Sequence, residues 1–423
     1  MTRLFSRNAW LVLWSTIING LAFGVFLFTF NFYVLSLGGE YDEAFLGTLQ
    51  SAASLATIAM ALPAAYMAQR FSPKWMMALG GLLTAVAYLG IVAFPASGPL
   101  VVFRMVAGAG VSLTAVAGAP FLMANTGLQE RQWVFSFQAG LGTAASFFGN
   151  LLAGLLPGWL GSLVGVGPTE TMAYRLSLGT IALFSLLSIV PLMLIRDRAR
   201  PAHPAPVALP WVQLRRYGLM FGRFLLPSLV IGLGAGLMQP FMNVYFRNVY
   251  KMPDPVIAAA FAVGGLAMAA GQFAGPPLAD RLGKINTVMA TQAASIPFLI
   301  TLGLGAWLVP SGAISAGVFF LIASVAYAFR LALMNLSNPV YQTFILERVP
   351  QEAQALLVSL TNLTFQVGWF IMPQVSGAWQ VRYGPSGFVL VFGSVTLLYA
   401  TAILIEYVFF HRERPIGAAA TTD

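Results

Sequence analysis

Cysteine is absent from the 423 residues of this chain, and histidine occurs twice, as His203 and His411. The sequence therefore offers no disulfide framework and no Cys/His metal site, and we expect neither a metal nor a cofactor. Charge is scarce as well, because charged residues make up 8% of the chain and hydrophobic residues 58%, whereas soluble domains carry about 25% charged residues. That composition cannot cover a protein with a water-exposed surface, so the sequence predicts an integral membrane protein.

The apolar residues fall into twelve runs long enough to cross a membrane core of about 30 Å. Their approximate extents are 10–34, 44–69, 75–94, 100–125, 134–160, 174–195, 221–246, 256–279, 285–309, 314–343, 355–379 and 388–410. We therefore predict an all-α integral membrane protein with twelve transmembrane helices. The net charge of +9 does not indicate a nucleic-acid partner, because the basic residues are scattered beside apolar runs.

The basic residues indicate the orientation of the chain in the membrane. With a cytoplasmic N-terminus, sixteen Lys and Arg residues lie on the cytoplasmic side and four on the other, which follows the positive-inside rule. We expect the protein to lie in the cell membrane (inner or plasma membrane), with both termini on the cytoplasmic side. Two arginines, Arg104 and Arg330, fall inside predicted helices.

The longest break between runs divides the chain into two halves. Residues 196–217 contain four prolines and five arginines, which predicts a stiff cytoplasmic linker between domains 1–195 and 218–423. Four residues of the first run recur 212 positions later in the seventh run. These pairs are Gly20 and Gly232, Gly24 and Gly236, Asn31 and Asn243, and Tyr33 and Tyr245. The pattern indicates an internal duplication.

Residues 275–284 read Gly-Pro-Pro-Leu-Ala-Asp-Arg-Leu-Gly-Lys. This loop resembles the signature loop of the major facilitator superfamily, whose pattern contains Leu-Ala-Asp-Arg-x-Gly followed by Arg or Lys. The first half carries a worn copy in which Gln69 and Ser72 replace the Asp and the Gly. Arg104, Gly108 and Gly110 resemble the Arg-x-x-x-Gly-x-Gly motif of the fourth helix in that family. The resemblance implies two pseudo-symmetric six-helix bundles and transport by alternating access.

The resemblance also implies a conformational latch on the cytoplasmic face, whose residues are Arg70, Lys74, Asp280, Arg281, Gly283 and Lys284. A carboxylate at a helix end caps a neighbouring helix or pairs with a basic residue only while that face is closed. The substitutions in the first half put its part of the latch in doubt. The alternative is that these residues cap a tight turn and follow the positive-inside rule.

Acidic residues are absent from the central part of every predicted helix, and Glu406 lies near the inner end of the last one. Proton-driven transporters usually need a titratable group at the midplane. Passive facilitation, or coupling through another ion, is therefore favoured over a carboxylate relay.

The two arginines in the helices are candidate substrate ligands. Arg330 lies near the centre of its run, where an arginine costs about 2.5–3.5 kcal/mol, so we expect it to face a watery cavity or a partner. On this interpretation Arg330→Ala abolishes transport and leaves the fold intact. Arg104 lies in the outer third of its run, and the alternative is that it extends to the membrane surface.

Amide side chains in the helices complete the candidate binding site, namely Asn19, Asn31, Gln239, Asn243, Asn335, Asn338 and Gln366. In the family that the sequence resembles, the first, fourth, seventh and tenth helices line the central cavity. The alternative is that these amides form hydrogen bonds between helices, which contribute about 0.6 kcal/mol each.

We therefore predict a secondary transporter, expected to be monomeric, for a small amphipathic or anionic solute. Export of a drug-like or lipid-like compound is the first candidate. Uptake of a sugar or metabolite, or a receptor of the same fold that moves nothing, are alternatives. An enzyme is not expected, because no nucleophile with a base, paired carboxylates or metal cluster lies at membrane depth.

Overall fold

The computed structural model describes residues 5–127, 131–196 and 210–410, and this part of the chain contains helices and no strand. The α-helices are α1 (Arg7–Ser36), α2 (Glu43–Arg70), α3 (Pro73–Ala93), α4 (Ser97–Ala124), α5 (Arg131–Leu163), α6 (Thr171–Met193), α7 (Pro210–Met238), α8 (Met242–Tyr250), α9 (Asp254–Leu282), α10 (Lys284–Leu308), α11 (Ala316–Leu346), α12 (Gln351–Tyr383) and α13 (Gly387–Phe410). Two short 3-10 helices, η1 (Gln239–Phe241) and η2 (Gly384–Ser386), connect α7 to α8 and α12 to α13.

Eleven segments of the described chain are long and apolar enough to cross a membrane. Ten of them correspond to the first ten runs expected from the sequence. The eleventh covers 55 residues, Leu356–Phe410, and contains most of α12 and all of α13. Gly384 separates these two helices with φ +58, a conformation that glycine adopts without a steric penalty.

Most of the expected linker, residues 197–209, lies outside the described residues. Its last part, 210–217, belongs to α7, which begins with Pro210. A proline is well tolerated at the first position of a helix, because the N–H that it lacks has no partner there.

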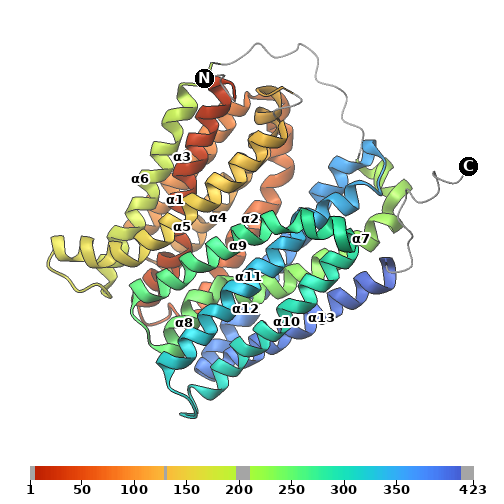
Figure 1. Ribbon diagram of the computed structural model, residues 1–423. Coiled ribbons are helices and arrows are strands. Elements are labelled where there is room, and N and C mark those ends of the chain that lie inside the picture. The colour runs from red at the N-terminus through yellow and green to blue at the C-terminus, as the bar shows by residue number, and fades with distance from the viewer. Residues whose placement is uncertain (1–4, 128–130, 197–209, 411–423) are drawn as a thin grey trace, which may run out of the picture.

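The two sets of helices meet at one end and separate at the other. In Figure 1, α1 to α6 and α7 to α13 lie side by side and diverge towards the end where α6 stops and α7 starts. We call the end where the two sets diverge the linker end, and the opposite end, where they meet, the closed end. The largest apolar core contains residues of both sets, whereas the cores nearer the linker end belong to residues 5–195 or to residues 221–410 alone.

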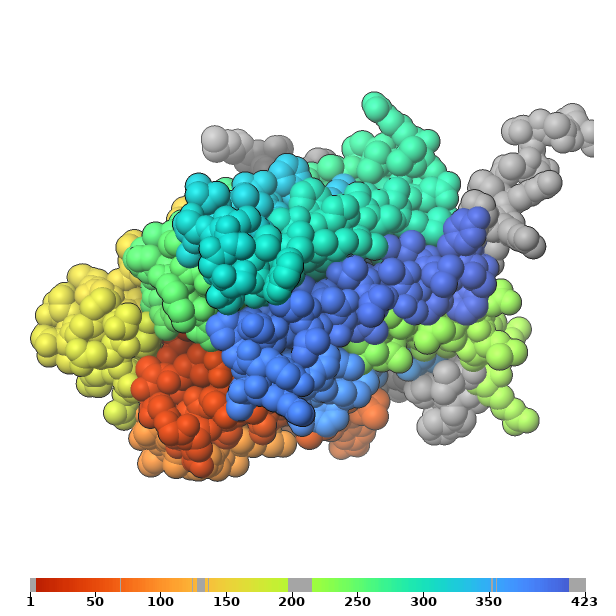
Figure 2. Space-filling view, turned by 90° about the horizontal axis from the view of Figure 1, so that it is seen from below, coloured from red at the N-terminus to blue at the C-terminus, as the bar shows by residue number. Residues whose placement is uncertain are grey.

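Small residues allow the backbones of the two sets to approach closely at the closed end. A Cβ atom placed on Gly47 of α2 would lie 2.4 Å from the carbonyl oxygen of Pro373 in α12, and one on Gly377 would lie 2.1 Å from that of Glu43. On the other side of the molecule, Gly154 of α5 packs against α9. Seen from below, segments of the two sets abut without a gap (Figure 2). Close backbone packing of this kind is typical of membrane helices with small residues at the interface.

Residues that recur at the offset of 212 make the same contacts in both sets. The hydroxyl of Tyr33 donates to the carbonyl of Ile91 at 3.1 Å, and that of Tyr245 donates to the carbonyl of Leu302 at 2.7 Å. In the other pair, Asn31 and Asn243 meet each other directly. The repeated residues therefore hold equivalent places in the fold.

Candidate functional site

A cavity of about 530 Å³ lies among the first six helices. Its walls are formed by residues of α1, α2, α3, α4 and α6, and α12 closes one side with Phe365, Gln366 and Trp369. None of the residues that line it is acidic. The apolar part of the wall includes Phe23 and Val111, whose side chains are more than half exposed.

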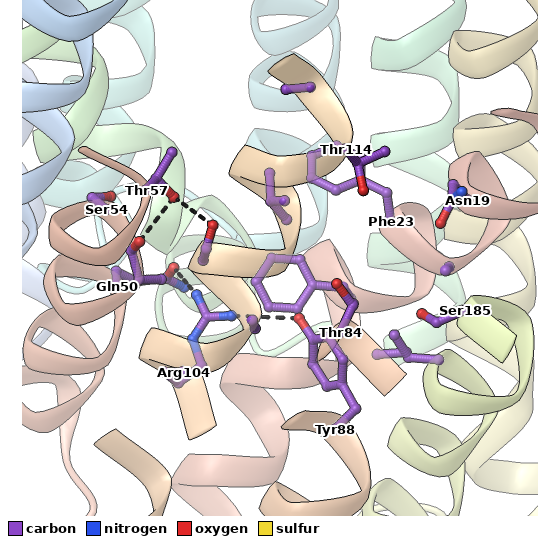
Figure 3. Close-up of a pocket in the computed structure, with 18 of the residues that line it drawn as sticks. Asn19, Phe23, Gln50, Ser54, Thr57, Thr84, Tyr88, Arg104, Thr114 and Ser185 are labelled. Atoms are coloured by element: carbon purple, nitrogen blue, oxygen red, sulfur yellow. Dashed lines mark hydrogen bonds between the residues drawn. The ribbon is translucent and has the colours of Figure 1, made fainter. Parts of the chain in front are cut away.

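Arg104 is the charged residue of the cavity wall, and it points inward (Figure 3). Its Nη2 donates to Oε1 of Gln50 at 3.0 Å and its Nη1 to the hydroxyl of Tyr88 at 3.4 Å. The guanidinium carbon lies 4.6 Å from the ring centre of Phe30 and 4.9 Å from that of Phe26. Arg104 is 4% exposed, and its Nε is buried without a partner. The alternative that Arg104 extends to the membrane surface is wrong, because aromatic rings and an amide hold it inside.

Two glycines of α4 explain why Arg104 fits between its neighbours. A Cβ on Gly108 would lie 2.2 Å from the carbonyl oxygen of Ala53 in α2, and one on Gly110 would lie 2.6 Å from that of Gly80 in α3. The helix α4 can therefore approach α2 and α3 closely enough for Arg104 to reach both Gln50 and Tyr88. This is the local role of the Arg-x-x-x-Gly-x-Gly motif in the structure.

Hydroxyl groups add polar positions to a wall that is mostly apolar. Thr84 and Thr114 donate to carbonyls of their own helices, Gly80 at 2.9 Å and Gly110 at 3.1 Å, so their remaining lone pairs can accept from a solute. Ser185 lies across the cavity from Arg104, and its hydroxyl is buried without a partner (Figure 3). The cavity is thus cationic at one side and uncharged but polar at the other.

The structure brings three of the predicted substrate ligands to this cavity, namely Asn19, Arg104 and Gln366. It adds Gln50, which is not among the substrate ligands predicted from the sequence. The signal was present, since Gln50 is an uncharged amide inside the apolar run 44–69.

Asn31 and Asn243 lie at the closed end instead, buried between the two sets of helices. The Nδ2 of Asn31 donates to Oδ1 of Asn243 at 2.8 Å and to the carbonyl of Pro240 at 2.6 Å. The Nδ2 of Asn243 donates to the carbonyl of Phe28 at 2.8 Å. Pro240 follows Phe28 by the same 212 positions that separate the two asparagines, so the contact is symmetric. Gln239 is half-buried beside it in η1.

Arg330 is not among the residues that line the cavity. It is 1% exposed, and its Nη2 donates to the hydroxyl of Tyr399 in α13 at 3.0 Å, while its Nε and Nη1 are buried without a partner. Asn335 donates to the carbonyl of Leu331 in its own helix, and the exposed Asn338 donates to Asn335 at 3.3 Å. These residues of α11 therefore lie apart from Arg104 in this conformation.

Three of the predicted latch residues, Arg70, Lys74 and Lys284, make contacts within their own set of helices. Lys74 donates to the carbonyls of Met193 and Ile195, and Lys284 forms an ion pair with Glu347. Arg70 stacks on Tyr66, while Asp280 and Arg281 are exposed. That arrangement accompanies a linker end at which the two sets are apart. A latch that joins them stays a prediction for the other conformation.

The loop between α2 and α3, which is the degenerate copy of the signature loop, has a different backbone conformation from the loop between α9 and α10. Gly283 connects α9 to α10 with φ +83, a conformation that favours glycine. At the matching position Ser72 has φ −63 and precedes Pro73, the first residue of α3. The turn after α2 therefore does not need the glycine that the family pattern places there.

Comparison with known proteins identifies the family. A family model described as Major Facilitator Superfamily matches residues 12–373. No curated protein sequence matches the chain. Several solved transporter structures share the fold, and three of them are compared with this chain.

A variant of the nucleoside transporter NupG has a TM-score of 0.75 and 14% identity, and the match covers 96% of this chain and 99% of that one. A bacterial homologue of the human lysosomal transporter Spinster, inward-facing and unoccupied, has a TM-score of 0.75 and 15% identity over 98% and 100% of the two chains. A D-xylose-proton symporter has a TM-score of 0.73 and 15% identity over 95% and 97%. At these identities the likeness concerns the fold alone.

Proposed function

The chain belongs to the major facilitator superfamily, and on that premise we propose that it is a secondary transporter that carries a small amphipathic organic anion across a membrane by alternating access. The observation that carries this proposal is the surroundings of Arg104. Its guanidinium faces the cavity, and its partners are an amide and a phenol rather than a carboxylate. A buried cation without a counter-charge is unfavourable, so an anionic group of a solute would be stabilised there by charge-assisted hydrogen bonds.

The apolar part of the wall supports an amphipathic solute. Phe23, Phe26, Val111 and Trp369 offer apolar surface beside the guanidinium. Removal of apolar surface from water contributes about 25 cal/mol per Å², whereas the single cation supplies orientation and selects charge. Export of a drug-like or lipid-like anion is the first candidate for the direction of transport.

The arrangement of the helices supports the topology that we propose for this transporter. The 55-residue segment Leu356–Phe410 is too long for one crossing, because 55 residues of helix span about 80 Å and the membrane core is about 30 Å thick. We therefore count it as two crossings, α12 and α13, for a total of twelve. The proposed domains are 1–195 and 218–423, joined by residues 196–217, of which 210–217 form the start of α7.

On the positive-inside rule we propose that the protein lies in the cell membrane with its linker end facing the cytoplasm and with both termini on that side. The conformation described here is then open to the cytoplasm and closed to the outside. Transport requires the reverse arrangement as well, in which the contacts of Gly47 and Gly377 separate and the latch residues of the linker end meet. The unit that does this is proposed to be a monomer.

A second candidate function is uptake of a neutral solute with several hydroxyl groups, such as a sugar or another metabolite. The observation in its favour is the hydroxyl-lined side of the cavity together with Trp369, whose Nε1 is buried without a partner. Two of the similar structures are a nucleoside transporter and a D-xylose-proton symporter. A receptor that binds a solute without moving it is the third possibility.

Flux into proteoliposomes separates these functions. We expect radiolabelled octanoate to be taken up faster than the uncharged octanamide, and both faster than xylose, with protein-free liposomes as the background. Uptake of xylose alone would support the second candidate. A thermal shift with octanoate but no flux of any probe would identify a receptor. Repeating the assay with and without a pH gradient tests whether a proton is coupled to transport.

A further inference from the structure

Gln50 connects the cavity to the contact between the two asparagines at the closed end. Its Oε1 accepts a hydrogen bond from Arg104 at 3.0 Å, and its Nε2 donates to Oδ1 of Asn31 at 3.4 Å. Asn31 in turn donates to Asn243 and to the carbonyl of Pro240 on the other set of helices. An unbroken series of hydrogen bonds therefore runs from the guanidinium to the closed end.

The chemistry of the groups determines the direction of every bond in this series. The guanidinium of Arg104 can only donate, so the oxygen of Gln50 must face it. The carbonyls of Pro240 and Phe28 can only accept, so the Nδ2 atoms of Asn31 and Asn243 must face them. The Oδ1 of Asn31 is then left to accept, and the amide group of Gln50 is its donor. If the side-chain amide of Gln50, Asn31 or Asn243 turned by 180°, so that its oxygen and nitrogen exchanged places, at least one of these hydrogen bonds would be lost.

The contact at the closed end depends on that donor. Asn31 is 3% exposed, so an Oδ1 atom without Gln50 would be a buried acceptor with no partner. The loss of a partner for such a group shifts an equilibrium by about 5- to 100-fold. Because the halves separate at this point when the closed end opens, Asn31 regains water there and the penalty disappears. Loss of the Gln50 bond therefore favours opening of the closed end.

We propose that Gln50 is the residue that couples occupancy of the cavity to opening of the closed end. An anion that pairs with Arg104 competes for the guanidinium that orients the Gln50 amide, and Asn31 thereby loses its donor. The inference rests on the proposed function, because it takes the solute to be an anion that binds Arg104. It identifies a two-state contact that the solute biases, which is what coupling between sites requires.

The absence of cysteine from the chain makes a direct measurement feasible, because introduced cysteines are the only thiols. Glu40 and Ser311 lie in exposed loops at the closed end, one on each set of helices. Spin labels on E40C and S311C report the distance across that end by pulsed electron resonance. Octanoate is the probe, and octanamide is its uncharged match. We expect octanoate, and not octanamide, to raise the population with the longer distance at least fivefold.

Two substitutions test the role of Gln50. Gln50→Glu keeps the shape but places a carboxylate beside Arg104 and removes the N–H donor to Asn31, so we expect the closed end to open without any probe. Gln50→Leu removes both bonds and should do the same. The matched control is Gln380→Leu, because Gln380 is a buried amide near the closed end that bonds within its own helix to Ser376. This control should keep the wild-type distances and the response to octanoate.

The outcomes separate the coupling from the proposed function. If both Gln50 variants keep the wild-type distances and the wild-type response to octanoate, the coupling is wrong, whatever the flux assay shows. If octanoate neither binds nor moves but both variants still open the closed end, Gln50 holds that end closed as proposed, whereas the anionic solute and its effect through Arg104 are wrong. Opening of the Gln380→Leu variant to the same extent would also overturn the coupling, because loss of any buried amide would then suffice.

Discussion

The two halves of the molecule each carry one arginine at membrane depth, Arg104 and Arg330, and the surroundings of the two side chains differ. Arg104 faces a cavity of about 530 Å³ and bonds Gln50, whereas Arg330 is packed against Tyr399 with two buried nitrogens that lack partners. Tyr399 itself is held tightly, since a Cβ on Gly234 of α7 would lie 2.5 Å from its ring. An arginine at membrane depth thus lines a cavity in one half and lies in a packed core in the other.

The comparison predicts its largest effect at Arg104. Arg104→Met keeps most of the volume but removes the charge and both hydrogen bonds. We expect uptake of octanoate to fall by about 100-fold, because removing one member of a buried charge pair costs about 3–5 kcal/mol, part of which the methionine recovers by packing. The measurement is flux in proteoliposomes, with the melting temperature of the purified variant as the control for folding. Wild-type flux in a folded Arg104→Met variant would show that Arg104 does not bind the solute.

The matched substitution in the other half should affect stability instead of binding. From its position in the sequence, Arg330→Ala is expected to abolish transport and leave the fold intact. Its burial against Tyr399 changes that expectation: we now predict a loss of about 2 kcal/mol of stability, the lower end of the range for truncation in a core, since an unfavourable buried charge is lost as well. Arg330→Met fills the space and should bind octanoate as the wild type does. Thermal unfolding measures the stability of both variants, and the thermal shift with octanoate measures their binding. Loss of octanoate binding in a stable Arg330→Met protein would show that Arg330 contributes to substrate binding after all.

Two of the close helix contacts between the halves, at Gly377 and at Gly154, should also respond unequally to substitution. A Cβ on Gly377 would meet the backbone of Glu43, whereas the nearest atom to one on Gly154 is the Cβ of Ala258 at 2.5 Å. Backbone cannot move aside as easily as a side chain, so Gly377→Ala should shift the equilibrium towards an open closed end by about 1 kcal/mol and Gly154→Ala by less. The distance between labels on E40C and S311C measures both shifts. Equal shifts would show that the contacts at Gly377 and Gly154 contribute equally to the stability of the closed end.

The smallest effect is expected at Glu406, a fully buried acid of the C-terminal half. Its side chain is fully buried in α13, its Oε1 accepts from Gln292 at 3.4 Å, and its Oε2 has no partner. Glu406→Gln keeps the shape and replaces a group whose charged form is unfavourable inside a protein. We expect the melting temperature to stay the same or to rise by a few degrees, with flux unchanged. A loss of flux that depends on the pH gradient would instead assign a proton to Glu406.

Much of the fold could be predicted because its signals are local. Eleven of the twelve apolar runs became single helices within a few residues of their expected ends, as in 44–69 and Glu43–Arg70, because the length of a membrane helix follows from the thickness of the bilayer. The run 221–246 was wrong, since α7 begins at Pro210 and the helix is interrupted by η1, which contains Pro240. The offset of 212 marked residues that hold equivalent places, as Tyr33 and Tyr245 show. The site was predicted less well. Asn19, Arg104 and Gln366 reached the cavity, while Asn31 and Asn243 were assigned to substrate and instead join the two halves.

The sequence by itself determined that this protein lies in a membrane, where most of its helices begin and end, and that Arg104 and Arg330 are charges at membrane depth. Only the tertiary structure decided which of the two arginines faces a cavity and that Gln50 bonds both Arg104 and Asn31. The physical reason is that hydropathy records how much of a helix avoids water, not which way the helix is rotated. That rotation is set by close contacts such as those of Gly108 and Gly110 with neighbouring helices, between residues far apart in the chain.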